Sequence, residues 1–105
     1  MSETRLVFEA ALESARQGRK AVLATIVNAK GSTPRGVGSR MLIDLETGLV
    51  GTVGGGCGEA QVIETAREVF ETGIAQVARV DLTEDYLSWS PAVCGGIFDV
   101  LIERV

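Results

Sequence analysis

Apolar and polar positions along the chain follow patterns that predict two helices and five strands. Helical spacing of apolar residues predicts one helix from Glu3 to Gln17 and a second from Glu59 to Thr72. Branched and apolar runs predict strands at 21–28, 39–45, 49–53, 76–83 and 97–103. The order is α-β-β-β-α-β-β. We therefore expect an α/β (α+β) fold, a single domain over residues 1–105 with a mixed sheet packed by two helices.

The first predicted strand, Ala21 to Asn28, is apolar at nearly every position. Such a run is typical of a central strand that is covered on both faces. It is also the longest apolar run, and it is far shorter than the ~20 residues of a membrane helix. We expect no membrane association.

Composition narrows the classes of function. The chain has 105 residues, a net charge of −4 and no histidine. Net negative charge argues against sequence-independent binding to nucleic acid, and the lack of histidine excludes a triad with an imidazole base. The N-terminus does not resemble a secretory signal, so we expect a cytoplasmic protein whose two cysteines are free thiols.

Basic residues gather in the first half of the chain. Residues 14–43 contain six of them and no acid, namely Arg16, Arg19, Lys20, Lys30, Arg35 and Arg40. We assign the first three to the C-terminal end of the first helix, where cations are favourable. The other three are candidates for holding a small anionic ligand.

A glycine run separates the third predicted strand from the second helix. It reads Gly54-Gly55-Gly56-Cys57-Gly58-Glu59, and it leaves the first amides of the helix free to meet an anion. A thiol at a helix N-terminus is shifted toward thiolate, which binds transition metals and takes part in sulfur exchange. The alternative for Cys57 is a small buried hydrophobe.

A second glycine-rich thiol segment, Cys94-Gly95-Gly96, precedes the last predicted strand. Cys94 fits a packed core thiol equally well. If the two strand ends meet, Cys57 and Cys94 flank one pocket and are the candidate metal ligands. Two thiols without a histidine or a CxxC motif do not complete a zinc site.

Two charged residues are further candidates. Arg35, in the loop Gly31-Ser32-Thr33-Pro34-Arg35, has the fork shape that holds a phosphate with two parallel hydrogen bonds, although the loop is also ordinary turn material. Glu59 either makes a charge–dipole contact in the first turn of its helix or pairs with the donor edge of a pterin. Trp89, in the long loop 84–93, stacks on a flat ring, meets a partner protein or anchors its own loop.

Four segments in this order resemble the XdhC/CoxI family, the accessory factors of xanthine dehydrogenase and related molybdenum hydroxylases. The segments are Gly31–Arg35, Gly38–Leu42, Gly51–Ala60 and Cys94–Gly96. The resemblance implies a protein that binds the molybdenum cofactor (molybdopterin) and helps deliver it, in sulfurated form, to a molybdenum hydroxylase apoenzyme.

If the chain binds this cofactor, the chemistry of thiolates predicts that Cys57 and Cys94 lie near the molybdenum or its sulfur. By their chemistry, Arg35 and the amides after Gly56 would meet the phosphate, and Glu59 the pterin. The implied partners are the apoenzyme and a sulfurase, and we also expect a homo-oligomer.

The chain departs from the family pattern at two places. The family continues into a Rossmann-like C-terminal domain, whereas this chain stops at Val105. We therefore expect a stand-alone domain that works without it or with a separately encoded Rossmann-domain protein. Val93 stands where the family commonly has a glycine before the second cysteine.

Three hypotheses of function follow. The first is a cofactor-binding chaperone with no catalytic residues. The second is an enzyme of sulfur or nucleotide chemistry that uses Cys57 as nucleophile. The third is a structural subunit that binds a Rossmann-domain partner through Trp89 and the acidic C-terminal part.

Overall fold

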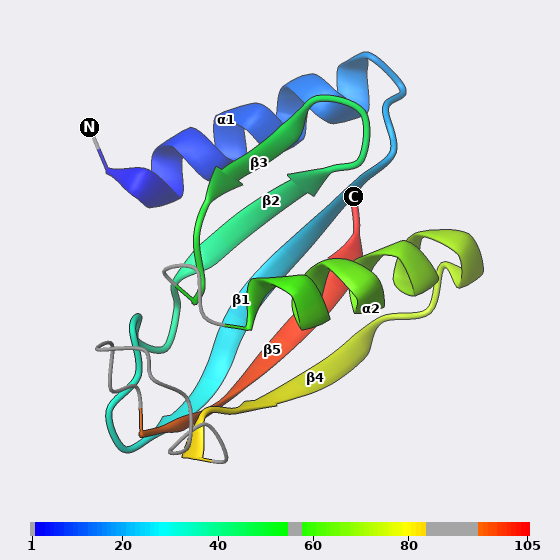
Figure 1. Cartoon of the computed structure of the whole chain (residues 1–105). Coiled ribbons are helices and arrows are strands. Elements are labelled where there is room, and N and C mark those ends of the chain that lie inside the picture. Colours follow the sequence, from blue (N-terminus) through cyan, green and yellow to red (C-terminus); the bar gives the residue numbers. More distant parts are fainter. Residues whose placement is uncertain (1, 55–57, 84–94) are drawn as a thin grey trace.

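The computed structural model describes residues 2–54, 58–83 and 95–105 and confirms the predicted order of elements (Figure 1). Its two helices and five strands are α1 (Glu3–Arg16), β1 (Ala21–Lys30), β2 (Arg40–Asp44), β3 (Gly48–Gly51), α2 (Glu59–Thr72), β4 (Gln76–Asp81) and β5 (Ile97–Arg104).

The five strands form one sheet in the order β3-β2-β1-β5-β4. Strand β1 is central, as its apolar run predicts. Every pairing is antiparallel, so the sheet is not mixed. A parallel pair requires a long crossover between neighbouring strands, and the one helical crossover, through α2, joins β3 to β4 at opposite edges.

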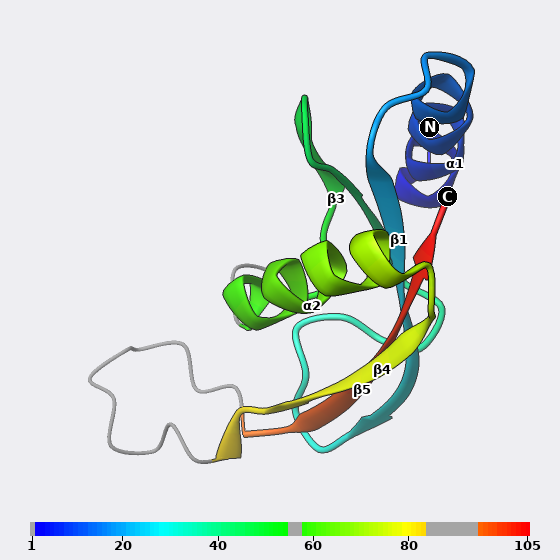
Figure 2. The same ribbon diagram turned by 90° about the vertical axis from the view of Figure 1, so that its right-hand side faces the viewer.

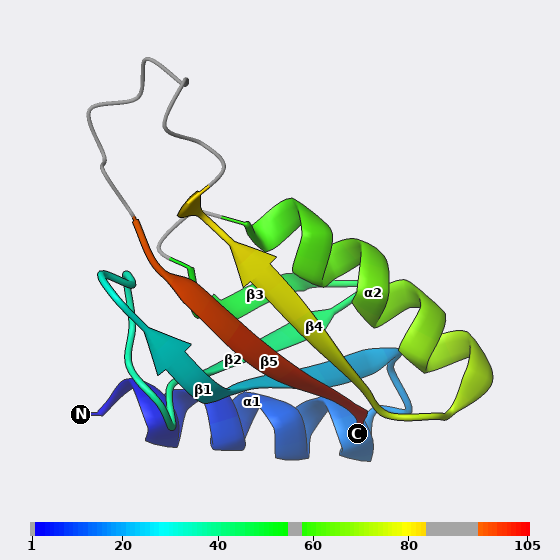
Figure 3. The ribbon, with the colours of Figure 1, turned by 90° about the horizontal axis from the view of Figure 1, so that it is seen from below.

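The two helices cover opposite faces of the sheet (Figures 2 and 3). Helix α1 packs against β1, β2 and β3, whereas α2 packs against β1, β4 and β5. Alternation along β1 supplies both faces: Val22 and Ala24 join the large core under α2, and Ala21 joins the smaller cluster under α1. The centre of the sheet is therefore buried on both sides.

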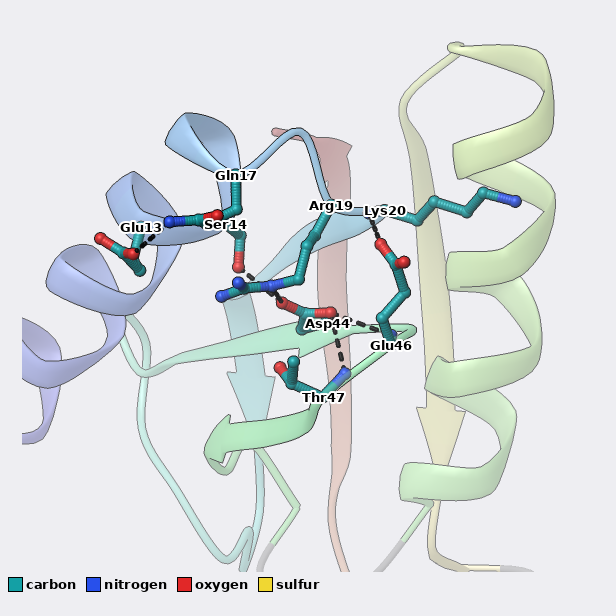
Figure 4. Close-up of polar contacts among 8 residues, drawn as sticks. All are labelled: Glu13, Ser14, Gln17, Arg19, Lys20, Asp44, Glu46 and Thr47. Atoms are coloured by element: carbon teal, nitrogen blue, oxygen red, sulfur yellow. Dashed lines mark hydrogen bonds and ion pairs between the residues drawn. The ribbon is translucent and has the colours of Figure 1, made fainter.

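A buried carboxylate stabilises the turn between β2 and β3 (Figure 4). Asp44 is only 3% exposed. It accepts hydrogen bonds from Ser14 Oγ at 2.7 Å and Arg19 Nε at 2.8 Å, and from the backbone N–H groups of Glu46 at 2.9 Å and Thr47 at 3.0 Å. Burial alone would raise the pKa of Asp44, but these four donors hold it well below its ordinary value.

The contacts of Asp44 show that the assignment of the Arg19 side chain to the C-terminal end of the first helix is wrong. The Arg19 side chain forms an ion pair with Asp44 and so links the α1–β1 connection to the β2–β3 hairpin. The sequence offers no signal for this pair, because the two residues are distant along the chain.

Strand β4 forms one edge of the sheet. The Gln61 side chain of α2 donates a hydrogen bond to the Arg79 carbonyl of this strand at 2.8 Å. On the same strand, the Arg79 side chain pairs with Asp99 of β5 at 3.0 Å.

The described residues contain no helix of the length and apolarity that a membrane crossing requires.

Candidate functional site

Six of the ten predicted site residues lie within the described part of the chain: Arg35, Gly54, Gly58, Glu59, Gly95 and Gly96. Gly55, Gly56, Cys57 and Cys94 lie outside the described residues, as does Trp89. The shared thiol pocket and the two cysteine metal ligands therefore stay predictions.

A chain of polar contacts connects Arg35 to Glu59. Arg35 Nη2 lies 3.6 Å from Glu3 Oε2, and Glu3 Oε1 accepts a hydrogen bond of 3.0 Å from the Thr52 N–H. The Thr52 hydroxyl in turn donates to Glu59 Oε1. The structure thus places the two predicted ligand-binding side chains at the ends of one network.

Sequence reasoning missed Glu3 and Thr52 as members of this network. Glu3 is a lone acid in the first turn of α1, a position that an ordinary charge–dipole contact already explains. Thr52 lies just before the glycine run, between a glycine and a valine. Its surroundings indicate a role for the backbone and give no signal for a role of the hydroxyl.

The turn at Gly51 gives the Glu3 carboxylate access to the Thr52 amide. Gly51 has φ +79°, a left-handed conformation that favours glycine. A Cβ there would lie 2.7 Å from Val7 Cγ2, 2.8 Å from the Arg40 carbonyl oxygen and 3.3 Å from Glu3 Oε1. The missing side chain is therefore what lets α1 approach the end of β3 this closely.

Helix α2 begins at a second glycine of this kind. Gly58 is its N-cap, with φ +71° and no capping side chain. A Cβ at Gly58 would overlap Val80 Cγ1 on β4. The start of α2, with Glu59 in its first turn, is thus pressed directly against β4.

The described end of the other glycine-rich segment docks on the loop that carries Arg35. A Cβ at Gly96 would lie 2.5 Å from the Ser32 carbonyl oxygen, 2.6 Å from that of Lys30 and 2.7 Å from Thr33 Cγ2. The Gly96 carbonyl accepts a hydrogen bond from the Leu82 N–H at 2.9 Å. The backbone of Gly96 therefore packs directly on the backbone of this loop, with no room for a side chain at position 96.

These contacts bring the described ends of both glycine-rich segments to the same end of the sheet. Gly58 lies against Val80 of β4, and Gly96 is hydrogen-bonded to Leu82, just beyond the end of β4. Gly58 follows Cys57 directly, and Gly95 follows Cys94 directly. The described neighbours of the two thiols therefore converge on one small region.

The other two cationic candidates have different surroundings. Arg40 donates to the Gly38 carbonyl at 3.0 Å and lies 5.1 Å from the centre of the Phe8 ring, so it fixes its own loop against α1. Lys30 lines a separate cavity of about 130 Å³ together with Arg79 and Asp99. Within the described ranges, no three His, Cys, Asp or Glu side chains gather as metal ligands do.

We expect Gly96→Ala to destabilise the fold by about 1–3 kcal/mol, because overpacking a filled site has that cost. Gly95→Ala is the matched control, since a Cβ at Gly95 meets nothing within 4 Å. Urea unfolding followed by circular dichroism measures both. Equal losses in the two variants would contradict the close docking of the loops.

Comparison with known proteins gives a consistent result. The model of the XdhC and CoxI family matches residues 14–81. A protein of Bacillus subtilis that is named as a probable subunit of xanthine dehydrogenase is 34% identical over 107 aligned residues, which cover 100% of this chain and 32% of that protein. An uncharacterized protein of Escherichia coli, YqeB, is 29% identical over 91% of this chain and 18% of its own length.

A solved structure shares the fold. The crystal structure described as a xanthine dehydrogenase from Bacillus halodurans superposes with a TM-score of 0.79 at 33% identity, covering 100% of this chain and 31% of that one. The chain thus spans about a third or less of the length of these relatives. Because the family model covers more than half of the chain, including the segment with Arg35 and the glycine run, this chain belongs to the XdhC and CoxI family.

Proposed function

We propose that this chain binds the molybdenum cofactor and serves in the maturation of a xanthine dehydrogenase-type molybdoenzyme. The observation that carries the proposal is that Gly58 and Gly96, in the described ends of two segments that each contain a cysteine, converge at one end of the sheet. The Bacillus subtilis relative, whose name refers to xanthine dehydrogenase, supports the choice of client.

The donor set of the described residues fits a pterin that carries a phosphate. Arg35 offers a guanidinium on a side chain that is 45% exposed, and the start of α2 offers amides to which no N-cap side chain is hydrogen-bonded. Glu59 offers a carboxylate to the amino-pyrimidinone edge of the pterin. Cys57 and Cys94, which lie outside the described residues, would supply thiolates. Thiolates are ligands for the molybdenum of the bound group or partners for its sulfur.

The recipient in this proposal is a molybdenum hydroxylase apoenzyme. The chain itself acts as a carrier, since its exposed cation, carboxylate and bare backbone suit binding and release. A sulfurase, a separate Rossmann-domain partner and a homo-oligomer stay predictions from the sequence.

The test is retention of pterin. Protein purified from a cofactor-replete host is expected to release a fluorescent oxidised pterin after acid treatment, and Arg35→Ala is expected to lower the retained amount about tenfold or more, because a charge-assisted pair contributes roughly 1.5–3 kcal/mol.

The matched control is Arg5→Ala, which removes another exposed arginine with a glutamate partner, 69% exposed on α1. It should retain pterin as the unmodified protein does. Absence of pterin from the unmodified protein would reject cofactor binding and leave the interaction-subunit hypothesis. Loss of turnover in Cys57→Ser with a sulfur donor would favour the enzyme hypothesis.

A further inference from the structure

Two hydrogen-bond donors near the glycine run converge on the carboxylate of Glu3, a residue of the chain itself. The Thr52 N–H donates to Glu3 Oε1 at 3.0 Å, and the Arg35 guanidinium lies 3.6 Å from Glu3 Oε2. A backbone amide and an arginine are also the groups with which proteins hold phosphate. The protein's own carboxylate therefore occupies a position that is built for an anion.

We propose that Glu3 is a displaceable internal anion, and that the phosphate group of an incoming ligand takes its place on Arg35 and the Thr52 amide. The identity of that ligand as a pterin phosphate rests on the proposed function. The anion site itself rests only on the contacts of Glu3, Thr52 and Arg35.

The energetics favour displacement. The Arg35 and Glu3 side chains are 45% and 43% exposed, and an exposed ion pair contributes no more than about 1 kcal/mol. A phosphate monoester carries roughly −1.5 to −2 charges at neutral pH, and it can form two parallel bonds with a guanidinium. A phosphate can therefore compete with the singly charged carboxylate for these donors, and on this proposal Glu3 lowers the apparent affinity for phosphate without blocking it.

The helix backbone can stay in place while the carboxylate leaves. Ser2 Oγ accepts a hydrogen bond from the Arg5 N–H at 3.2 Å and caps α1 independently of Glu3. Val7, a residue of the same helix, is fully buried against the sheet. Rotation of the Glu3 side chain into solvent is thus enough to open the site.

The test measures binding of inorganic phosphate to the 105-residue chain, with amide NMR shifts of Thr52 as the readout and sodium chloride at matched ionic strength as the blank. Glu3→Gln keeps the size of the side chain and an acceptor for the Thr52 amide but removes the charge that faces Arg35. We expect Glu3→Gln to tighten phosphate binding about three- to fivefold, which corresponds to an exposed ion pair of at most 1 kcal/mol.

Glu9→Gln is the matched control. Glu9 is an exposed glutamate on the same helix that pairs with Arg5 at 3.0 Å, so this variant changes net charge equally. We expect it to leave phosphate binding unchanged, and we expect Glu3→Gln/Arg35→Ala to lose the gain. Equal tightening by Glu9→Gln, or none by Glu3→Gln, would overturn the proposal.

The outcome is separable from that of the proposed function. A gain in phosphate affinity in Glu3→Gln, with no pterin in the purified protein, would support the anion site and reject the cofactor. Retained pterin in the purified protein, with unchanged phosphate affinity in Glu3→Gln, would support cofactor binding and reject Glu3 as a displaceable anion.

Discussion

Replacing Gly58 by alanine is expected to destabilise the fold by about 2–5 kcal/mol. Two effects add up. An L-residue in the left-handed conformation costs roughly 1–2 kcal/mol, and Gly58 has φ +71°. The new Cβ would also overlap Val80, a residue of the large core that is only 2% exposed. Overpacking of this kind costs about 1–3 kcal/mol more.

Gly18→Ala separates the two effects. Gly18 has φ +65°, and a Cβ there meets nothing within 4 Å, so this variant has the backbone strain without the overlap. Urea unfolding measures the loss of unfolding free energy in both variants. The larger loss in Gly58→Ala, minus that in Gly18→Ala, gives the cost of the overlap with Val80. If Gly18→Ala is as destabilised as Gly58→Ala, the contact between the start of α2 and β4 contributes nothing.

Replacing Asp44 by alanine is expected to destabilise the fold by about 2–4 kcal/mol. The substitution removes the acceptor of four hydrogen bonds and leaves the buried Ser14 hydroxyl and two backbone N–H groups without it. Leaving the buried Ser14 hydroxyl unsatisfied and breaking an ion pair whose carboxylate is buried both have large costs. The Arg19 side chain is 26% exposed, so its guanidinium can be hydrated again in the variant. The expected loss of stability is therefore smaller than the roughly 3–5 kcal/mol that breaking a fully buried ion pair costs.

The stabilisation by Asp44 depends on pH with a definite sign. The folded-state pKa of Asp44 lies well below its ordinary value, so the stabilisation is complete above about pH 4 and is lost as the pH falls below it. The difference in unfolding free energy between the unmodified protein and Asp44→Ala should therefore shrink in acid. Asp81→Ala, at an exposed carboxylate that accepts from Thr83, is the control and should show a much smaller loss at neutral pH. A difference that stays constant down to about pH 2 would contradict the assignment.

The order of elements could be predicted because it depends on local patterns. Apolar spacing located both helices, and runs of branched and apolar residues located the five strands. Pairing direction and the placement of the helices on opposite faces depend on contacts between distant segments, which periodicity does not record. The role of Arg19 was misassigned for the same reason, since its partner Asp44 lies in a different element.

The candidate site was predictable as a set of segments rather than as a set of contacts. The glycine run and the Arg35 loop were identified by composition, and the structure connects them through Glu3 and Thr52. The docking of Gly96 on the Ser32 carbonyl has no sequence signature, because a glycine required by a close approach looks the same as one required by a turn.

The hydrogen bond from Gln61 to the Arg79 carbonyl has a consequence for how this domain behaves at high concentration. An open sheet has two edges, and a bare edge is a template onto which the strand of another molecule can add, leading to fibrils. One edge here, β3, is only four residues long. On the other edge, a carbonyl that would accept an intruding strand already has a partner in Gln61, and the charged Arg79 and Asp81 stand beside it. Each margin of the sheet thus has a feature that disfavours the addition of a strand from another molecule.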